Sequence, residues 1–153
     1  MAVGKYDTEA EYVEYQKSEA VERGDDPEAW EEEWINNREE KFHPRFFALF
    51  NEVYEGKGVS ATSEKGDQKF EMSVHTTFLE PGFNIGITRR PAYINVEITI
   101  FEIANPDNKI VVTMDNVPGR DAGGYDFAVA SRVSEAYEKC GKEMAKLLIK
   151  KVK

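Results

Sequence analysis

The sequence contains few residues of the types that form thiol, disulfide or metal sites. It has one cysteine, Cys140, and two histidines, His43 and His75, among 153 residues. A single cysteine excludes an internal disulfide and a cluster of thiol ligands. The histidines fall on different predicted elements, and the HExxH, CxxC and EF-hand spacings are absent. We therefore expect no metal site and no cofactor.

Long hydrophobic runs are also absent. No segment approaches the roughly 20 apolar residues that span a bilayer as a helix, so no transmembrane segment is expected. The first residues, MAVGKYDTEAEYVEYQ, lack the basic start and the apolar core of a secretion signal. If Met1 is the true start, these features predict a cytoplasmic protein.

Sequence motifs of catalysis are missing as well. The chain has no GxGxxG turn between a strand and a helix and no GxSxG elbow, and Gly56-Lys57-Gly58 lacks the order of a phosphate-binding loop. Cys140 falls on the apolar side of a predicted helix, which favours a core position over a nucleophile. Dense exposed carboxylates rarely form a tuned acid–base pair. We expect a protein without enzymatic activity.

Negative charge is concentrated in the first 40 residues. The chain has a net charge of −9, and residues 1–40 hold 14 Asp and Glu against four Lys and Arg. A nucleic-acid-binding surface needs a basic footprint, so nucleic acid is not an expected partner. We interpret the acidic part as solvated helix faces, with docking to a basic partner as the alternative.

The acidic N-terminal part predicts two helices. Thr8 and Glu11 match a capping box at the start of a helix over about residues 8–23. Asp26-Pro27 restarts a helix, with the aspartate as its N-cap. An apolar stripe continues past Pro44, so we expect one long helix that is kinked there. The stripe consists of Trp30, Trp34, Phe42, Phe46, Leu49 and Val53.

The middle of the chain alternates between apolar and polar residues, which indicates β-strands. Lys69–Glu80 is the first long run, with Phe78 among its inward residues. Tyr93–Ile103 and Lys109–Val117 follow as the two strands of a hairpin. Val59–Ser63 is a shorter candidate. Each long strand has one polar face, which favours an antiparallel sheet covered on one side only.

A long amphipathic helix is predicted at residues 126–150, where apolar residues recur every three or four positions. We expect Gly141, beside that stripe, to let the helix approach the sheet closely. The fold class is therefore α+β: an antiparallel sheet of about four strands, with the N-terminal helices and the long C-terminal helix packed on one face. A single domain is expected, with an acidic helical part (1–56), the sheet (57–118), and a loop and C-terminal helix (119–153).

Two loops carry the best candidates for a functional surface. They are Pro81–Pro91 and Pro118–Phe127, which the predicted hairpin brings to the same end of the sheet. Loops on a rigid scaffold commonly bind partners, so we expect a protein-binding surface there. In the alternative interpretation Arg120 or Arg90 pairs with Asp121 and joins the two loops. The candidate binding residues are Phe83, Arg89, Arg90, Arg120 and Tyr125.

A small-ligand carrier is the second functional hypothesis. It needs a pocket between the kinked helix and the sheet, and the residues expected to line that pocket are Trp30, Trp34 and Phe46. The competing interpretation is that these aromatic rings fill the core, as an aromatic stripe at helical spacing ordinarily does.

The strings EPGFNIGI, RPAYIN, ANPDN and PGRDAGGYDF, together with the last helix, resemble a group of uncharacterised small proteins from Bacteroidetes. The resemblance covers roughly residues 78–150 and, more loosely, the helix from Trp30. Such proteins often have a secretion leader and are distantly similar to envelope lipoprotein domains that place an antiparallel sheet against helices. The resemblance thus implies the periplasm or cell envelope. The sequence departs from it by lacking the leader and most of a first strand before Gly4, which would leave a sheet edge open.

These observations together favour a non-catalytic structural or protein-interaction domain, which the resemblance associates with the bacterial cell envelope. A protein partner is expected, and no motif specifies its identity. The small-ligand carrier remains the alternative, and no motif specifies the oligomeric state.

Overall fold

The centre of the fold is a sheet of four strands. The computed structural model describes residues 1–119 and 128–151. Within these ranges the strand order is β1-β2-β5-β6, and the neighbours are antiparallel except for β1, which runs parallel to β2. The strands of this sheet are β1 (Ala2–Val3), β2 (Phe70–Glu80), β5 (Ala92–Glu102) and β6 (Asn105–Gly119).

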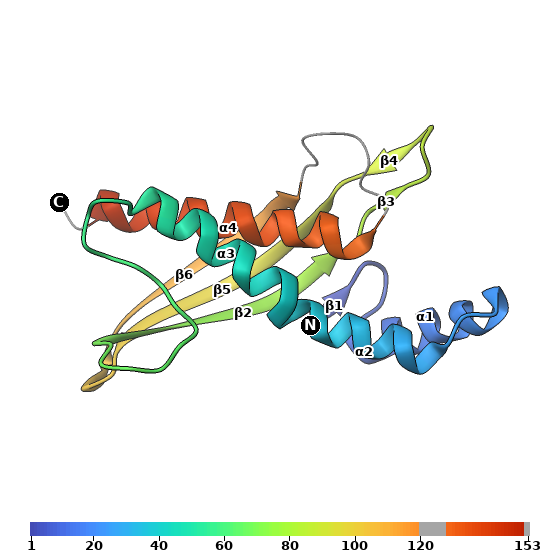
Figure 1. Cartoon of the computed structure of the whole chain (residues 1–153), viewed down its shortest axis with the longest axis horizontal. Helices are drawn as coiled ribbons and strands as arrows, with labels where there is room; N and C mark the ends of the chain where they lie inside the picture. Colours follow the sequence, from blue (N-terminus) through green and yellow to red (C-terminus); the bar gives the residue numbers. More distant parts are fainter. Residues whose placement is uncertain (120–127, 152–153) are drawn as a thin grey trace.

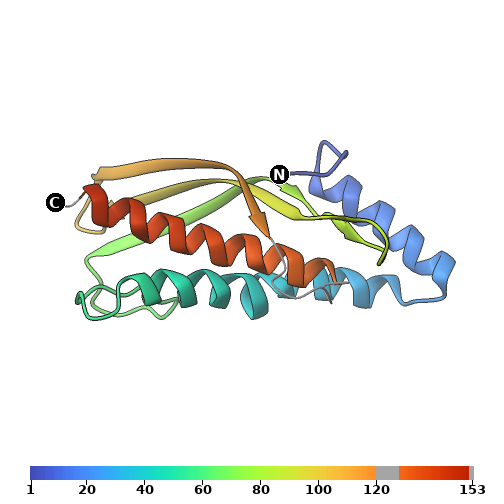
Figure 2. The same ribbon diagram turned by 90° about the horizontal axis from the view of Figure 1, so that it is seen from above.

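Helices cover one face of this sheet. α4 packs on β5 and β6, and α3 packs on α4, so that α4 lies between the sheet and α3 (Figure 2). α1 and α2 pack on each other at one end of the molecule, beyond the long strands (Figure 1). The helices are α1 (Glu9–Arg23), α2 (Pro27–Asn37), α3 (His43–Val53) and α4 (Val129–Lys151).

These elements confirm the predicted α+β class and the long C-terminal helix on one face of the sheet. The prediction of a strand at Val59–Ser63 is wrong, because these residues form none. Instead the side-chain amide of Asn51 pairs with the backbone of Ala61. Its Nδ2 donates to the Ala61 carbonyl at 2.9 Å, and its Oδ1 accepts from the Ala61 N–H at 2.7 Å. A helix side chain thereby replaces a partner strand, and the fourth strand of the sheet is β1.

The starts of α1 and α2 lie where the sequence places them. The Thr8 hydroxyl accepts from the Glu11 N–H and the Glu11 carboxylate accepts from the Thr8 N–H, each at 3.2 Å. Asp26 caps α2 by accepting from the N–H of Glu28 at 2.9 Å. These local signals act within one turn, which is why they are readable without the rest of the fold.

The predicted kink is a π-helical turn, Arg38–Phe42, between α2 and α3. Pro44 has no N–H to donate to the Glu40 carbonyl, and its ring would collide with that carbonyl in a regular α-helix. The turn widens instead, and the His43 N–H bonds the Arg38 carbonyl five residues back. The buried residues Asn37 and Phe42 are five positions apart instead of three or four, because the turn between them is wide. The buried residues along the helix are Trp34, Asn37, Phe42, Phe46 and Phe50.

Two bulges interrupt the strands on either side of Asn95 in β5. In β2 the register shifts at Thr77, and in β6 both Asp115 and Asn116 lie opposite Asn95. Asn116 has a φ of 54°, and its N–H donates to Asn95 Oδ1 at 2.8 Å. Bulges of this kind bend the strand that carries them and increase the local twist.

The bulge at Thr77 corrects one expectation for β2. Phe78 pairs with Asn95 on the outer face and lies beside the Tyr93 ring, with 5.9 Å between centroids. Leu79 takes the buried position instead, with 1% of its surface exposed. The prediction of an inward Phe78 is wrong, because one extra residue exchanges the two faces of the strand.

The buried stripe of α4 follows its predicted period, although the predicted start at residues 126–127 lies outside the described residues. The role expected for Gly141 needs correction, because a Cβ on it would overlap the Phe46 carbonyl oxygen of α3 rather than the sheet. The close approach to the sheet occurs at Gly119 in β6, where a Cβ would overlap the Arg132 carbonyl oxygen. The fully buried residues of α4 are Val133, Ala136, Cys140, Met144 and Ala145.

Substitution of Gly141 by alanine should destabilise the protein. The new methyl group has to push α3 away from α4, and overpacking of this kind costs about 1–3 kcal/mol. This outweighs the gain of up to about 1 kcal/mol that alanine brings to a helix interior. We expect a lower midpoint in urea denaturation monitored by circular dichroism.

Gly66→Ala is the matched control for this substitution. Gly66 is exposed in a loop, and a Cβ there would meet only the flexible Gln68 side chain, at 3.3 Å. Its stability should stay within about 0.5 kcal/mol of the parent protein. Equal stability of the Gly141 and Gly66 variants would contradict the tight α3–α4 contact.

Candidate functional site

A short β-hairpin projects from the end of the sheet that leads out of β2 (Figure 1). It consists of β3 (Phe83–Asn84) and β4 (Arg89–Arg90), with Phe83 opposite Arg90 and Asn84 opposite Arg89. The Ile85 N–H donates to the Thr88 carbonyl at 3.1 Å and closes the turn. The predicted loop over residues 81–91 thus contains an ordered β-hairpin.

The tip of this hairpin is apolar and exposed. Ile85 and Ile87 expose 66% and 94% of their surface, and Phe83 exposes 42%. Between the two isoleucines, Gly86 has a φ of +84°, a conformation that side-chain-bearing residues rarely adopt. The glycine therefore shapes the turn that holds both isoleucines in solvent.

The base of the hairpin is held tightly. Gly82 has a φ of +63°, and a Cβ on it would overlap the Arg90 carbonyl oxygen of the opposite arm. Its N–H donates to Glu80 Oε1 at 3.1 Å. Position 82 therefore requires glycine for two reasons, its positive φ and the close approach of the other arm.

Arg132 of α4 fixes the same base from the helix layer. Its Nε donates to the Pro81 carbonyl at 3.1 Å and its Nη2 to the Gly82 carbonyl at 3.3 Å. The residue is buried, with 5% of its surface exposed. A buried guanidinium that bonds two successive carbonyls restricts how the hairpin can pivot.

The structure brings three of the five predicted binding residues together on this hairpin: Phe83, Arg89 and Arg90. Arg90 lies 3.6 Å from the Glu80 carboxylate and donates to the Tyr93 hydroxyl at 3.2 Å. It thereby ties the hairpin to β2 and β5. The other two predicted binding residues, Arg120 and Tyr125, lie outside the described residues, as does the proposed pairing partner Asp121.

The three residues predicted for a ligand pocket do not come together. Trp30 and Trp34 stack on each other with 5.7 Å between centroids, and Tyr12 of α1 packs against both. Phe46 follows Trp34 by 12 residues, which places it about 18 Å further along the helix at a rise of about 1.5 Å per residue. There it packs on Phe50 and against α4. The tryptophans thus join α1 to α2, and Phe46 joins α3 to α4.

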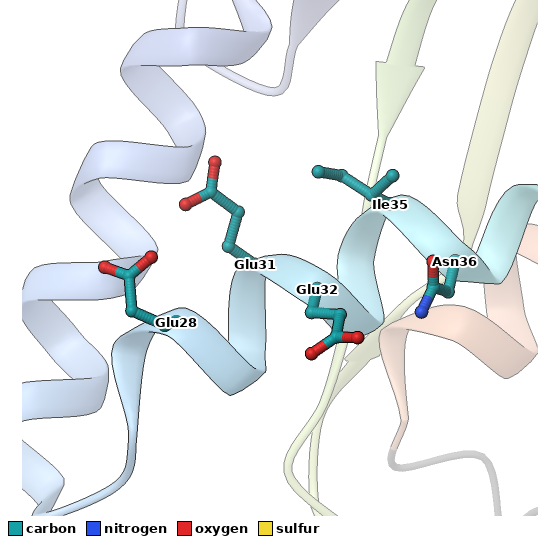
Figure 3. A pocket seen from close by; sticks show the side chains of 5 residues that line it. All are labelled: Glu28, Glu31, Glu32, Ile35 and Asn36. Atoms are coloured by element: carbon teal, nitrogen blue, oxygen red, sulfur yellow. The ribbon is translucent and has the colours of Figure 1, made fainter.

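A shallow pocket of about 350 Å³ lies on α2 (Figure 3). Two of its carboxylates are engaged by Lys17 of α1, whose Nζ lies 2.8 Å from Glu28 and 2.6 Å from Glu31. Hydrogen bonds to these two carboxylates raise the pKa of Lys17. The pocket therefore holds an interhelical ion pair rather than a free acid–base pair. It is lined by Glu28, Glu31, Glu32, Ile35 and Asn36.

Other kinds of site find little support in the described part of the chain. No group of three or more His, Cys, Asp or Glu is arranged there to hold a metal ion. His43 and His75 are both exposed and belong to different elements. Over the same residues, no helix combines the length and apolar content needed to cross a membrane. The hairpin is therefore the candidate site with the most distinctive surface.

Comparison of the chain with protein-family models, with curated proteins and with solved structures finds no match.

Sequence reasoning selected Phe83, Arg89 and Arg90 of the hairpin but not the two isoleucines at its tip, Ile85 and Ile87. Phe83, Ile85 and Ile87 alternate around Gly86, a period of two that indicates two short arms joined by a turn. This pattern could have identified Ile87 as an exposed position. The contribution of Arg132 had no comparable signal, because its partners lie 50 and 51 residues earlier in the chain.

The Cys140 thiol should be unreactive in the folded protein. It is fully buried, and burial raises its pKa from 9.0 to about 12. The unfolded thiol loses its proton above about pH 9, whereas the folded one keeps it, so the free energy of unfolding should fall as pH rises from 9 towards 12. This contribution amounts to at most about 1.4 kcal/mol per pH unit.

Urea denaturation at pH 8 and pH 10.5, with Cys140→Ala as the matched variant, measures this effect. Tyr12, whose pKa burial raises to about 12, adds a loss of the same sign in both proteins, so the variant isolates the cysteine. The variant should lose less stability between the two pH values. Rapid alkylation of the native thiol at pH 8 would contradict its burial.

Proposed function

We propose that this chain is a non-catalytic interaction domain of the bacterial cell envelope that binds a protein partner through the β3–β4 hairpin. The observation that carries the proposal is the exposure of Ile85 and Ile87 at the tip of the hairpin, whose base is fixed by hydrogen bonds from Arg132. Exposing two isoleucines to water costs free energy that a partner's apolar surface recovers. The fixed base lowers the conformational entropy lost on binding.

The hairpin also indicates the chemistry of its partner. Ile85 and Ile87 form an apolar tip, so the partner surface should be an apolar socket. Two arginines, Arg89 and Arg90, follow this tip, but Arg90 already pairs with Glu80, so the socket is specified by the isoleucines. A membrane surface fits less well. Two cations contribute only about 2 kcal/mol towards an anionic bilayer, and the chain as a whole carries a net charge of −9. Repulsion of the protein by the lipid headgroups therefore favours a protein as the partner.

The proposal that the domain is non-catalytic is supported by the environment of the described cysteine and histidines. The cysteine is buried with a raised pKa, and the two histidines are exposed on separate elements. The envelope assignment rests on the sequence resemblance alone.

A photoreactive phenylalanine analogue at position 87 tests the hairpin in cells. Irradiation should produce a discrete adduct with one partner protein, because the side chain at this position is almost entirely exposed. Affinity of the purified partner for the Ile87→Asp variant should fall at least about tenfold, as expected when a central apolar contact becomes charged. Thermal stability should remain within about 0.5 kcal/mol of the parent.

Val59→Asp is the matched control, since Val59 is a half-exposed apolar residue in a separate loop. It should bind the partner normally, and the analogue at position 59 should give no adduct. Equal losses for both variants, or the lack of any adduct at position 87, would remove the hairpin as the binding surface. Flotation of the protein with phosphatidylglycerol vesicles would instead indicate a membrane surface.

A further inference from the structure

Among the described residues, the outer edge of β2 has no neighbouring strand along most of its length. β1 pairs only with the last part of β2, so no described strand lies beside Phe70–Thr77. The opposite edge strand, β6, contains the features that discourage pairing: Pro106, Pro118 and the bulge at Asp115–Asn116. The open part of β2 has no proline, glycine or lysine and reaches its bulge only at its end. This edge is therefore suited to accept another strand.

The inner face beside this edge is also incompletely covered. Phe70 exposes 58% of its surface and Ile110 exposes 42%, although both point towards the side that carries the helices. Met72 and Val74 of β2 are half-buried, whereas Ile98 between β2 and β6 is fully buried. The apolar layer thus stops short of the β2 edge, and an added strand would extend it.

We propose that a second copy of this chain pairs with this edge, β2 against β2, in an antiparallel register centred on Ser73. Antiparallel pairing about a two-fold axis keeps both helix layers on the same side of the joined sheet. Each residue then lies opposite a residue of the same face, which restricts the centre to a single residue of the strand. The result is a continuous sheet across the two copies.

The register centred on Ser73 places complementary side chains opposite each other. On the outer face Glu71 lies opposite His75 of the second copy, and the reverse pair completes the symmetry. On the inner face Met72 lies opposite Val74, so that half-buried apolar residues meet. Neither Glu71 nor His75 has an ion-pair partner among the described residues. Within its own chain His75 lies opposite Glu97 of β5, so it would stand between two carboxylates.

Neighbouring registers lack this complementarity. A centre at Met72 places Lys69 opposite His75 and leaves Glu71 opposite a serine. A centre at Val74 places His75 opposite a serine and Glu71 opposite a threonine. The Ser73 register also agrees with β1. The second copy's strand begins at Phe70, opposite Thr76, and leaves Phe78 and Leu79 to their partners in β1.

A cysteine at the proposed two-fold axis tests the register directly. Ser73→Cys should form an intermolecular disulfide on mild oxidation, because directly opposed residues have Cβ atoms about 4.5–5.5 Å apart. Glu71→Cys is the matched control on the same face. Its two copies would be offset by four residues, about 13 Å along the strand, and should not crosslink. The native Cys140 is fully buried and should not interfere.

Charge exchange tests the same pairing without a covalent bond. His75→Glu should weaken self-association at least about tenfold, because two attractive pairs become repulsive. Glu71→Lys should weaken it similarly. An equimolar mixture of the two variants should recover dimers, since the introduced lysine then meets the introduced glutamate while the native Glu71 meets the native His75. Lys109→Glu, which alters charge on the outer face of the other edge strand, should have no effect.

Analytical ultracentrifugation over the micromolar to millimolar range at pH 6.5 gives the readout, with circular dichroism confirming that each variant is folded. A wild-type protein that stays monomeric throughout would overturn the proposal. So would equal crosslinking of the Ser73→Cys and Glu71→Cys variants, or a mixture of charge variants that fails to associate. Neither measurement involves the hairpin, so its outcome is independent of the proposed partner.

Discussion

The close contact of α4 with the layers on both of its sides is the constraint on which the rest of the structure depends. Gly119 lets β6 touch the helix backbone at Arg132, and Gly141 lets α3 touch it one face away. With both contacts made through backbone, the helix has little freedom to slide or rotate between the layers. Its Arg132 side chain therefore emerges at a fixed point and holds Pro81 and Gly82. Interior packing thus determines how an exposed hairpin is presented.

The sequence predicts those parts of the fold that depend on neighbouring residues. The capping box at Thr8 and the alternation of β5 act over a few positions, and both are found as expected. The prediction of a strand at Val59–Ser63 fails because the backbone of this segment pairs with the Asn51 side chain, which no strand pattern reveals. The prediction of an inward Phe78 fails for a similar reason, because a bulge at Thr77 shifts the register. Its position depends on the opposing Asn95, and the apolar Phe78 continues the alternation in sequence although the register has changed.

The candidate site divides along the same line. Phe83, Arg89 and Arg90 could be chosen from loop composition, and the structure places them together. The fixed base of the hairpin could not be predicted, because Arg132 bonds Pro81 and Gly82, which precede it by about 50 residues. The three aromatic residues of the ligand hypothesis share one helical stripe but pack on different neighbours. The stripe indicates which face is buried, whereas the partner of each ring is decided by how α1 and α4 approach that face.

The two proposed surfaces are physically connected, because β2 forms the open edge and leads directly into the hairpin at Pro81. In an antiparallel pair centred on Ser73 the two hairpins would lie at opposite ends of the joined strands, with their bases at Pro81 about 53 Å apart from a rise of about 3.3 Å per residue. A partner that displays repeated sockets at that spacing would be held by both hairpins, and the second contact would form within an existing complex. A modest apolar tip of this size would then suffice for stable attachment, since avidity requires no larger interface.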